Sequence, residues 1–284
     1  MSSPLWITDP HLNFVSDGRR SELLQEIHDW SPSAVLIGGD IAEATSFDRY
    51  LREFATELDC PICFVLGNHD YYHGTIPQVR QSARQLMQEW PQLRWLPESG
   101  PVPLSDGSLL VGHGGWGDAR AGDFDTSTIL LNDYLAIQDL RSAQLEELLN
   151  REANSDPRSV LNDWLRERLR QLGDDAATSL RSQVSNALAQ AESVTVLMHV
   201  PPFREACWYA GKTSDDNWAP HFVCQAAGVV LRELMSAAPD QHMTVLCGHC
   251  HGEGTVDILP NLRVLTGAAE YGAPAIQTLW PDVT

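Results

Sequence analysis

The sequence predicts an α/β fold. Short apolar runs of strand length alternate along the chain with segments whose apolar residues recur at helical spacing. The chain has 284 residues, of which 43% are hydrophobic and 20% charged, a composition typical of globular proteins. A fibrous or wholly disordered chain is thereby excluded, and we expect a single domain over residues 1–284.

The expected strands are eight apolar runs, most of them closed by polar residues or glycine. They are 5–7, 34–37, 62–66, 109–111, 194–198, 244–247, 264–265 and 275–279. Between them, apolar side chains share one helix face in three segments, around Leu23 to Ile27, Leu51 to Leu58 and Val79 to Trp90. Pro77 suits the first turn of the third helix, and Pro91 follows its end.

Strand patterns disappear between about residues 134 and 192, where leucine-rich, charged segments predict a helical insertion. An apolar stripe in this region must pack on another surface, either the flank of the main sheet or a second subunit. The stripe consists of Leu161, Trp164, Leu165, Leu169 and Leu172. The oligomeric state is left open.

Charge and hydropathy limit the partners of the protein. A formal net charge of −19 repels polyanions, so we expect no nucleic-acid partner. Apolar runs such as Val35 to Ile37 are far shorter than the roughly 20 residues that cross a bilayer, so no membrane partner is expected. The chain opens without a secretory leader pattern, which favours the cytoplasm. Cys60 and Cys63 have redox or zinc spacing but no matching second pair, which favours buried packing instead.

Polar clusters of metal-ligand residue types follow five of the predicted strands. They contain Asp9 and His11, then Asp40, then Asn68, His69 and Asp70, then His199, and finally His249 and His251. Each cluster alone is explained equally well by a turn, a helix cap or a buried histidine. The carboxyl ends of strands in open α/β sheets line one crevice, so together the clusters predict one site.

In this order the five clusters resemble those of the calcineurin-like metallophosphoesterase family, over about residues 5–72 and 194–270. The resemblance implies two packed mixed β-sheets flanked by helices, in a four-layer sandwich. It also implies two divalent metals. Asp9, His11 and His251 would hold the first, Asn68, His199 and His249 the second, and Asp40 would bridge both.

The chemistry of these residues agrees with that implication. Carboxylate, imidazole and amide ligands without a thiolate suit Mn, Fe or Zn. Two such ions sharing a water would supply a bridging hydroxide as nucleophile at phosphorus. The serine-nucleophile pattern Gly-x-Ser-x-Gly is absent from the chain.

His69 matches a family position that protonates or steadies the leaving oxygen rather than binding metal. Such a histidine needs an acceptor on its other ring nitrogen. Asp70 and Glu43 are the two candidates, with a preference for Glu43, although Glu43 could equally be a first-turn charge on the following helix. The family's protein-phosphatase branch has arginine and glycine after the second motif, and this chain has Ile41 and Ala42 there, so a phosphoprotein substrate is not expected.

Substrate contacts are expected from two segments. The glycine-rich run 112–118 is predicted to form a loop at the site, with His113 or Trp116 touching substrate or, equally, with Trp116 packed in a turn. The segment 201–221 offers Arg204, Trp208, Tyr209 and Lys212, the only lysine of the chain, as a phosphate clamp or as solvated surface residues.

The expected function is hydrolysis of a small phosphoester by a dinuclear metal centre. A nuclease or other large-substrate phosphodiesterase is the first alternative. Arginines at 158, 166, 168 and 170 could track a nucleic-acid backbone, but acidic residues are interleaved with them. A non-catalytic scaffold of the same fold is the second alternative, although such a protein would be expected to have lost ligands.

Overall fold

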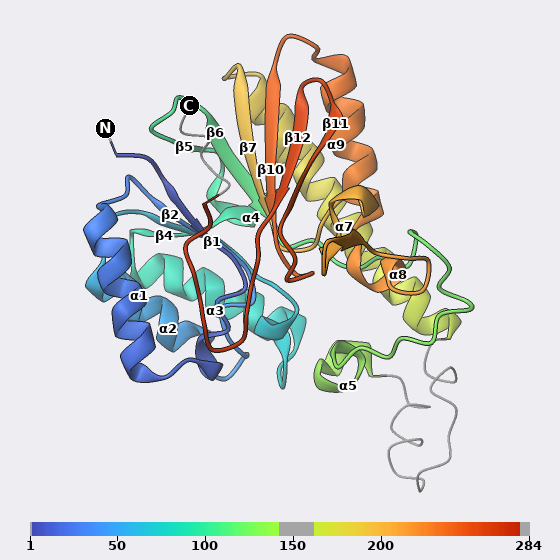
Figure 1. Cartoon of the computed structure of the whole chain (residues 1–284), viewed down its shortest axis with the longest axis horizontal. Helices are drawn as coiled ribbons and strands as arrows, with labels where there is room; N and C mark the ends of the chain where they lie inside the picture. Colours follow the sequence, from blue (N-terminus) through green and yellow to red (C-terminus); the bar gives the residue numbers. More distant parts are fainter. Residues whose placement is uncertain (1, 142–161, 279–284) are drawn as a thin grey trace, which may run out of the picture.

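The structure is a computed structural model that describes residues 2–141 and 162–278. Two β-sheets lie face to face, and helices cover their outer faces (Figure 1). The predicted α/β fold with two packed sheets is therefore confirmed. In these residues no helix is both long and apolar enough to cross a membrane.

The first sheet is wholly parallel, whereas a mixed sheet was expected. Its strands run in the order β1 (Leu5–Ile7), β2 (Val35–Gly38), β3 (Ile62–Val65) and β4 (Leu93–Trp95). Each connection passes through a helix that returns the chain to the same end of the sheet, so successive strands must be parallel. These helices are α1 (Asp17–Trp30), α2 (Phe47–Glu57) and α3 (Ile76–Glu89).

The second sheet is mixed, as predicted. Its order is β11 (Gly254–Leu259), β12 (Leu262–Thr266), β10 (His242–Cys247), β7 (Ser193–Met198), β6 (Leu109–His113) and β5 (Val102–Pro103). The inner four strands are parallel, and both edge strands are antiparallel to their neighbours. Its outer face is covered by α7 (Asp163–Leu188) and α9 (Gln225–Ala237) (Figure 1).

The remaining elements are short and lie in the connections. They are α4 (Leu96–Ser99), α5 (Asp133–Ala136), α8 (Ala219–Phe222), the hairpin of β8 (Trp208–Tyr209) and β9 (Lys212–Thr213), and the 3-10 turns Leu12–Phe14, His69–Tyr71, Gln138–Leu140 and Arg204–Ala206.

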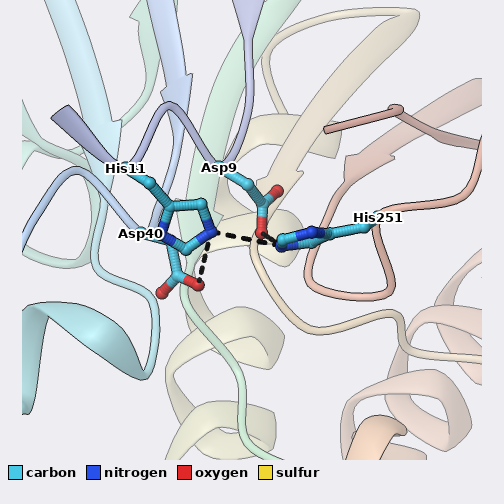
Figure 2. Close-up of side chains that lie close together, drawn as sticks. All are labelled: Asp9, His11, Asp40 and His251. Atoms are coloured by element: carbon cyan, nitrogen blue, oxygen red, sulfur yellow. Dashed lines mark hydrogen bonds and ion pairs between the residues drawn. The ribbon is translucent and has the colours of Figure 1, made fainter. Parts of the chain in front are cut away.

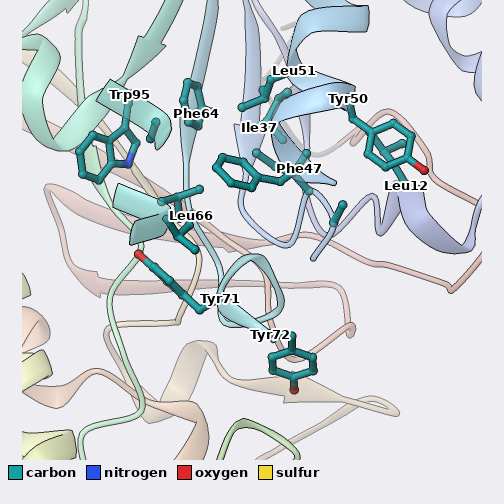
Figure 3. Close-up of a cluster of buried hydrophobic side chains, with 14 of the residues drawn as sticks. Leu12, Ile37, Phe47, Tyr50, Leu51, Phe64, Leu66, Tyr71, Tyr72 and Trp95 are labelled. Atoms are coloured by element: carbon teal, nitrogen blue, oxygen red, sulfur yellow. The ribbon is translucent and has the colours of Figure 1, made fainter. Parts of the chain in front are cut away.

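Alternation along the parallel strands divides the core into layers. Leu36 and Cys63 point toward the second sheet, whereas their neighbours Ile37 and Phe64 point toward the helices (Figure 3). This is the period of two expected for strands buried on both faces. Cys63 is a free thiol that packs between the sheets, and burial raises its pKa to about 12, so it serves as a small hydrophobic side chain.

Helix α7 belongs to the layered fold rather than to an appended insertion. It connects β6 to its parallel neighbour β7, a crossover that requires such a helix. Leu165, Leu169 and Leu172 of the predicted stripe are buried, as expected for packing on the sheet side of the molecule, but Trp164 is 47% exposed. Residues 142–161 of the predicted insertion, with Leu161 and Arg158, lie outside the described residues.

The glycine-rich run 112–118 is a packing device. A Cβ on Gly112 would collide with the backbone carbonyl of Leu197 on the neighbouring strand β7, and one on Gly114 would collide with that of Leu66, so Gly114 allows the end of β6 to lie close to the end of β3. His113 Nδ1 accepts a hydrogen bond from the Gly115 amide at 3.0 Å. Trp116 is buried against Tyr71, with ring centroids 5.7 Å apart.

His113 makes the stability of the protein pH-dependent. Burial lowers the pKa of His113 from 6.5 to about 3. Between these values the unfolded chain binds a proton that the folded chain does not, so the free energy of unfolding falls as the pH is lowered, by at most about 1.4 kcal/mol per pH unit. In His113→Asn, whose Oδ1 can accept the same hydrogen bond, we expect this contribution to disappear in urea unfolding between about pH 7 and about pH 4.

The exposed residue His242 provides the control. His242→Asn should leave the pH dependence of unfolding close to that of the parent chain. An identical slope in His113→Asn and the parent would contradict the assignment of His113 as a buried neutral histidine.

Candidate metal centre

The seven predicted ligands meet at one edge of the two sheets. Each lies just beyond the carboxyl end of a parallel strand, because parallel strands present those ends together. Asp9 and His11 follow β1, Asp40 follows β2, Asn68 follows β3, His199 follows β7, and His249 and His251 follow β10.

One group of ligand atoms is formed by Asp9, His11, Asp40 and His251 (Figure 2). Their ligand atoms all lie within 4.8 Å of one another. His11 Nε2 is 3.1 Å from His251 Nε2 and 3.7 Å from Asp40 Oδ2. His251 Nε2 is in turn 3.6 Å from Asp9 Oδ1.

A second group shares Asp40 with the first. It contains Asp40, His199 and His249, again within 4.8 Å. His199 Nε2 lies 3.4 Å from Asp40 Oδ1 and 2.9 Å from Asn68 Oδ1, so the amide oxygen of Asn68 joins this group. Because Asp40 Oδ2 faces His11 and Oδ1 faces His199, this carboxylate lies between two adjoining ligand groups.

These residues fit divalent metal ions. His199 Nδ1 donates to the Gly38 carbonyl at 2.9 Å, which leaves its Nε2 as a lone pair facing two oxygen acceptors. His249 Nε2 is buried without a hydrogen-bond partner among the described residues. A bound cation would accept the lone pairs of His199 Nε2 and His249 Nε2 and so satisfy both nitrogens. Imidazole, carboxylate and amide ligands of this kind suit Mn, Fe or Zn.

Electrostatics within the site point the same way. Burial raises the pKa of Asp40 to about 8 and lowers the pKa of His11 to about 2. Burial also raises the pKa of Asp9 and lowers that of His199. Without a cation the ionised carboxylates are therefore costly here, whereas a bound metal stabilises carboxylate and neutral imidazole together.

Five of the seven candidate ligands have a left-handed backbone. Nine non-glycine residues in the described ranges have positive φ, and five of them are Asp9 at 48°, His11 at 42°, Asp40 at 49°, His249 at 68° and His251 at 59°. Such backbone strain costs free energy and concentrates at functional sites. The loops therefore hold these candidate ligands in backbone conformations that are unfavourable for residues other than glycine.

Two glycines make room for the shared carboxylates. A Cβ on Gly67 would collide with the Asp40 carboxylate, and one on Gly248 would collide with that of Asp9. Asp9 is oriented by Thr8 Oγ1, which donates to its Oδ2 at 2.5 Å, and by the His249 amide, which donates to its Oδ1 at 2.9 Å.

His69 lies beside the two ligand groups and belongs to neither of them. Its Nε2 is 4.0 Å from Asp40 Oδ2 and 3.5 Å from the Tyr271 hydroxyl. The ring stacks on Tyr72 with centroids 4.3 Å apart. Burial lowers the pKa of His69, and the carboxylates of Asp133, Asp9 and Glu43 oppose that shift.

Neither Asp70 nor Glu43 orients His69, contrary to the prediction. His69 Nδ1 is buried without a partner among the described residues. The buried Asp70 carboxylate instead accepts hydrogen bonds from the Ala42 and Gly67 amides, at 3.0 and 2.8 Å, and so ties together the loops after β2 and β3. Glu43 lies 3.8 Å from His73.

Asp133 and Tyr72 were not predicted from the sequence. Asn68 Nδ2 donates to Asp133 Oδ1 at 2.8 Å, and the Tyr72 hydroxyl donates to the same oxygen at 2.6 Å. Asp133 therefore fixes the Asn68 amide with its oxygen toward His199. No motif surrounds Asp133, so only the tertiary contact identifies it.

A cavity of about 740 Å³ opens over the ligands. It is lined by Asp40, Asn68, His69, His249 and His251 together with the β8–β9 hairpin, α8 and Tyr271.

Of the predicted substrate residues, Tyr209 and Lys212 line this cavity. The prediction is corrected for the others, because the residues that line the cavity do not include His113, Trp116, Trp208 or Arg204. His113 and Trp116 belong to the packed run described above. Arg204 lies elsewhere because its Nε donates to the Ser214 carbonyl at 2.8 Å and its Nη1 pairs with Asp216 at 2.5 Å.

The family model of calcineurin-like phosphoesterases matches residues 4–252. No curated protein matches the sequence. Among solved structures, the chain is similar to a phosphopantetheinyl hydrolase from Mycobacterium tuberculosis, with 14% identity and a TM-score of 0.55 over 95% of this chain and 91% of that one. It is also similar to a dimetal phosphatase from Danio rerio, with 15% identity and a TM-score of 0.50 over 94% and 87%.

At these identities the solved structures show a shared fold alone. The four-layer fold and the converging histidine and carboxylate ligands are those of a metal-binding phosphoesterase. The chain belongs to the calcineurin-like phosphoesterase family, as the resemblance of its motifs implied.

Asp133 should control metal affinity through Asn68. In Asp133→Ala the Asn68 amide loses its acceptor and can rotate, so we expect metal affinity to fall by about 10- to 100-fold, measured by titration calorimetry on the folded protein. Asp133→Asn keeps an acceptor oxygen and should retain most of the affinity. Equal affinities in Asp133→Ala and the parent would rule out the positioning role.

Proposed function

We propose that the protein hydrolyses a small phosphoester at a dinuclear metal centre. The observation that carries this proposal is the pair of ligand groups that share the buried Asp40 carboxylate. When bound there, two divalent metals would act as Lewis acids toward phosphoryl oxygens and lower the pKa of a shared water.

We assign metal binding and proton donation to different residues of the chain. Asp9, His11 and His251 hold one metal, Asn68, His199 and His249 hold the other, and Asp40 is the ligand common to both. His69 lies outside these groups at the cavity. We assign it the donation of a proton to the leaving oxygen, because its Nε2 lies 4.0 Å from Asp40 Oδ2 while the residue belongs to neither ligand group.

Charge pairing disfavours the nuclease alternative. On α7, Arg166 pairs with Asp125 and Asp163, and Arg168 lies 3.9 Å from Asp139, so these arginines are partly neutralised. A chain of charge −19 whose arginines 166 and 168 are paired with acids lacks the usual source of affinity for nucleic acid. The strained ligand loops likewise disfavour a scaffold that has no use for the metals.

The metal centre itself can be tested with Asp40. We expect the purified protein to bind two divalent metals per chain after reconstitution with Mn, Fe or Zn, measured by elemental analysis. Asp40→Asn removes the shared negative charge and should lower the rate of phosphoester hydrolysis by at least about 100-fold while the fold persists.

The exposed Asp59 provides a matched control, and Asp59→Asn should leave metal content and rate unchanged. Trace metal after reconstitution, or full activity in Asp40→Asn, would defeat the proposal.

The role of His69 can be separated from metal binding. His69→Ala should keep its metals yet lose about 10²- to 10⁴-fold in rate on an alkyl phosphate, whose leaving oxygen needs a proton, and much less on an activated aryl phosphate. The exposed neighbour His73 is the control, since His73→Ala should affect neither substrate. Equal losses on both substrates would show that His69 is not the acid.

A further inference from the structure

Exposed aromatic side chains gather at the cavity above the ligands. Tyr209, Trp218 and Tyr271 are 69%, 44% and 51% exposed, and all three line it. In residues 2–141 and 162–278 only four other large hydrophobic side chains are exposed, and none of them lines this cavity. Aromatic surface left exposed around a cavity is typical of a ligand site.

The aromatic rings are anchored to the candidate ligands. Tyr271 stacks on His11 with ring centroids 4.3 Å apart, and Phe222 stacks on His249 at 4.5 Å. Trp218 meets the edge of Phe222 at 5.7 Å. A planar group bound among these rings would therefore lie directly beside the phosphoryl group at the metal centre.

Lys212 is the one Lys or Arg among the residues that line the cavity, and it is exposed. Within the described part of the chain its side chain has no hydrogen bond and no ion pair, although most arginines there are paired with acids. In a chain of charge −19, an unpaired cation beside a cavity is available for an anionic ligand.

Lys212 is separate from the metal ligands. It lies beyond the 4.0 Å ion-pair distance from Asp40, Asp133 and Asp215, the carboxylates that line the same cavity. It sits opposite Tyr209 across the β8–β9 hairpin. Its ammonium group is therefore not held by these carboxylates and is available to an anionic group of a ligand in the cavity.

We propose that the cavity binds a nucleotide with two phosphates. The scissile phosphate ester lies at the metal centre, the base lies among Tyr209, Trp218 and Tyr271, and the second phosphate lies at Lys212. This inference rests on the hydrolase function proposed above. A volume of about 740 Å³ suits a mononucleotide.

Hydrolysis of such a substrate breaks the bond between phosphorus and the ester oxygen and forms a bond between phosphorus and a water oxygen. A proton passes to the released alcohol, and inorganic phosphate leaves. The base and the second phosphate are unchanged, so they serve recognition alone.

Binding to the full chain after metal chelation tests recognition apart from catalysis. Three compounds serve as probes. Adenosine 3′,5′-bisphosphate has a base and two phosphates, adenosine 5′-monophosphate lacks the second phosphate, and ribose 5-phosphate lacks the base as well. By calorimetry we expect the bisphosphate to bind most tightly and ribose 5-phosphate most weakly. The manganese-loaded protein should rank the three in the same order by kcat/KM for phosphate release.

Matched variants assign the two contacts. Trp218→Leu should weaken bisphosphate binding by about 5- to 100-fold, the range for loss of one base stack. Trp164→Leu, a similarly exposed tryptophan on α7, should not. Lys212→Gln should lower the affinity for the bisphosphate by about tenfold or more and leave the affinity for the monophosphate nearly unchanged. Arg181→Gln on α7 is its control.

Three binding results would overturn the inference. Equal binding of ribose 5-phosphate and the bisphosphate would exclude base recognition. Equal effects of Trp218→Leu and Trp164→Leu would exclude the stack. Equal weakening of both nucleotides in Lys212→Gln would place Lys212 at the scissile phosphate instead. Hydrolysis of all three phosphates without preference would refute only this inference, whereas no hydrolysis of any phosphoester would refute the proposed function.

Discussion

Asp40 is buried where the carboxyl ends of the two sheets meet, and its two oxygens face different histidines. A carboxylate in that position is costly unless cations lie beside it, since burial raises its pKa to about 8. His11 Nε2 and His251 Nε2 also face each other there at 3.1 Å, so without a cation one of the two nitrogens must carry the proton between them. The site is thus built around positive charge that the chain's own side chains do not supply.

The surrounding structure keeps these groups from moving apart. The ligand loops have left-handed residues, and glycine is required where Gly67 and Gly248 touch the carboxylates. Stacked rings hold several histidines from the side, as Tyr72 does for His69. Burial at the junction of two well-packed sheets offsets the strain, which explains why a rigid four-layer core is needed for a small site.

Most positive charges of the described residues are paired with acids at the surface, whereas one lysine at the cavity is not. Negative charge is spread over the whole chain, and most arginines in the described residues form ion pairs at the surface. Such exposed pairs contribute little to stability but leave few cations free. Lys212 stands apart from them at the cavity, on a hairpin whose residues 209–213 are exposed, whereas most of the candidate metal ligands are buried.

The sequence by itself determined the α/β class and the strands that carry the site, and the resemblance of its motifs to the family implied the seven candidate ligands. It could do so because alternating apolar runs and polar strand ends are local patterns. The tertiary structure alone decided which neighbours these residues have. Asp70 binds backbone amides and Arg204 pairs with Asp216, whereas Asp133 reaches Asn68 from 65 residues away. Side-chain partners depend on how distant loops pack, and no local spacing encodes that contact.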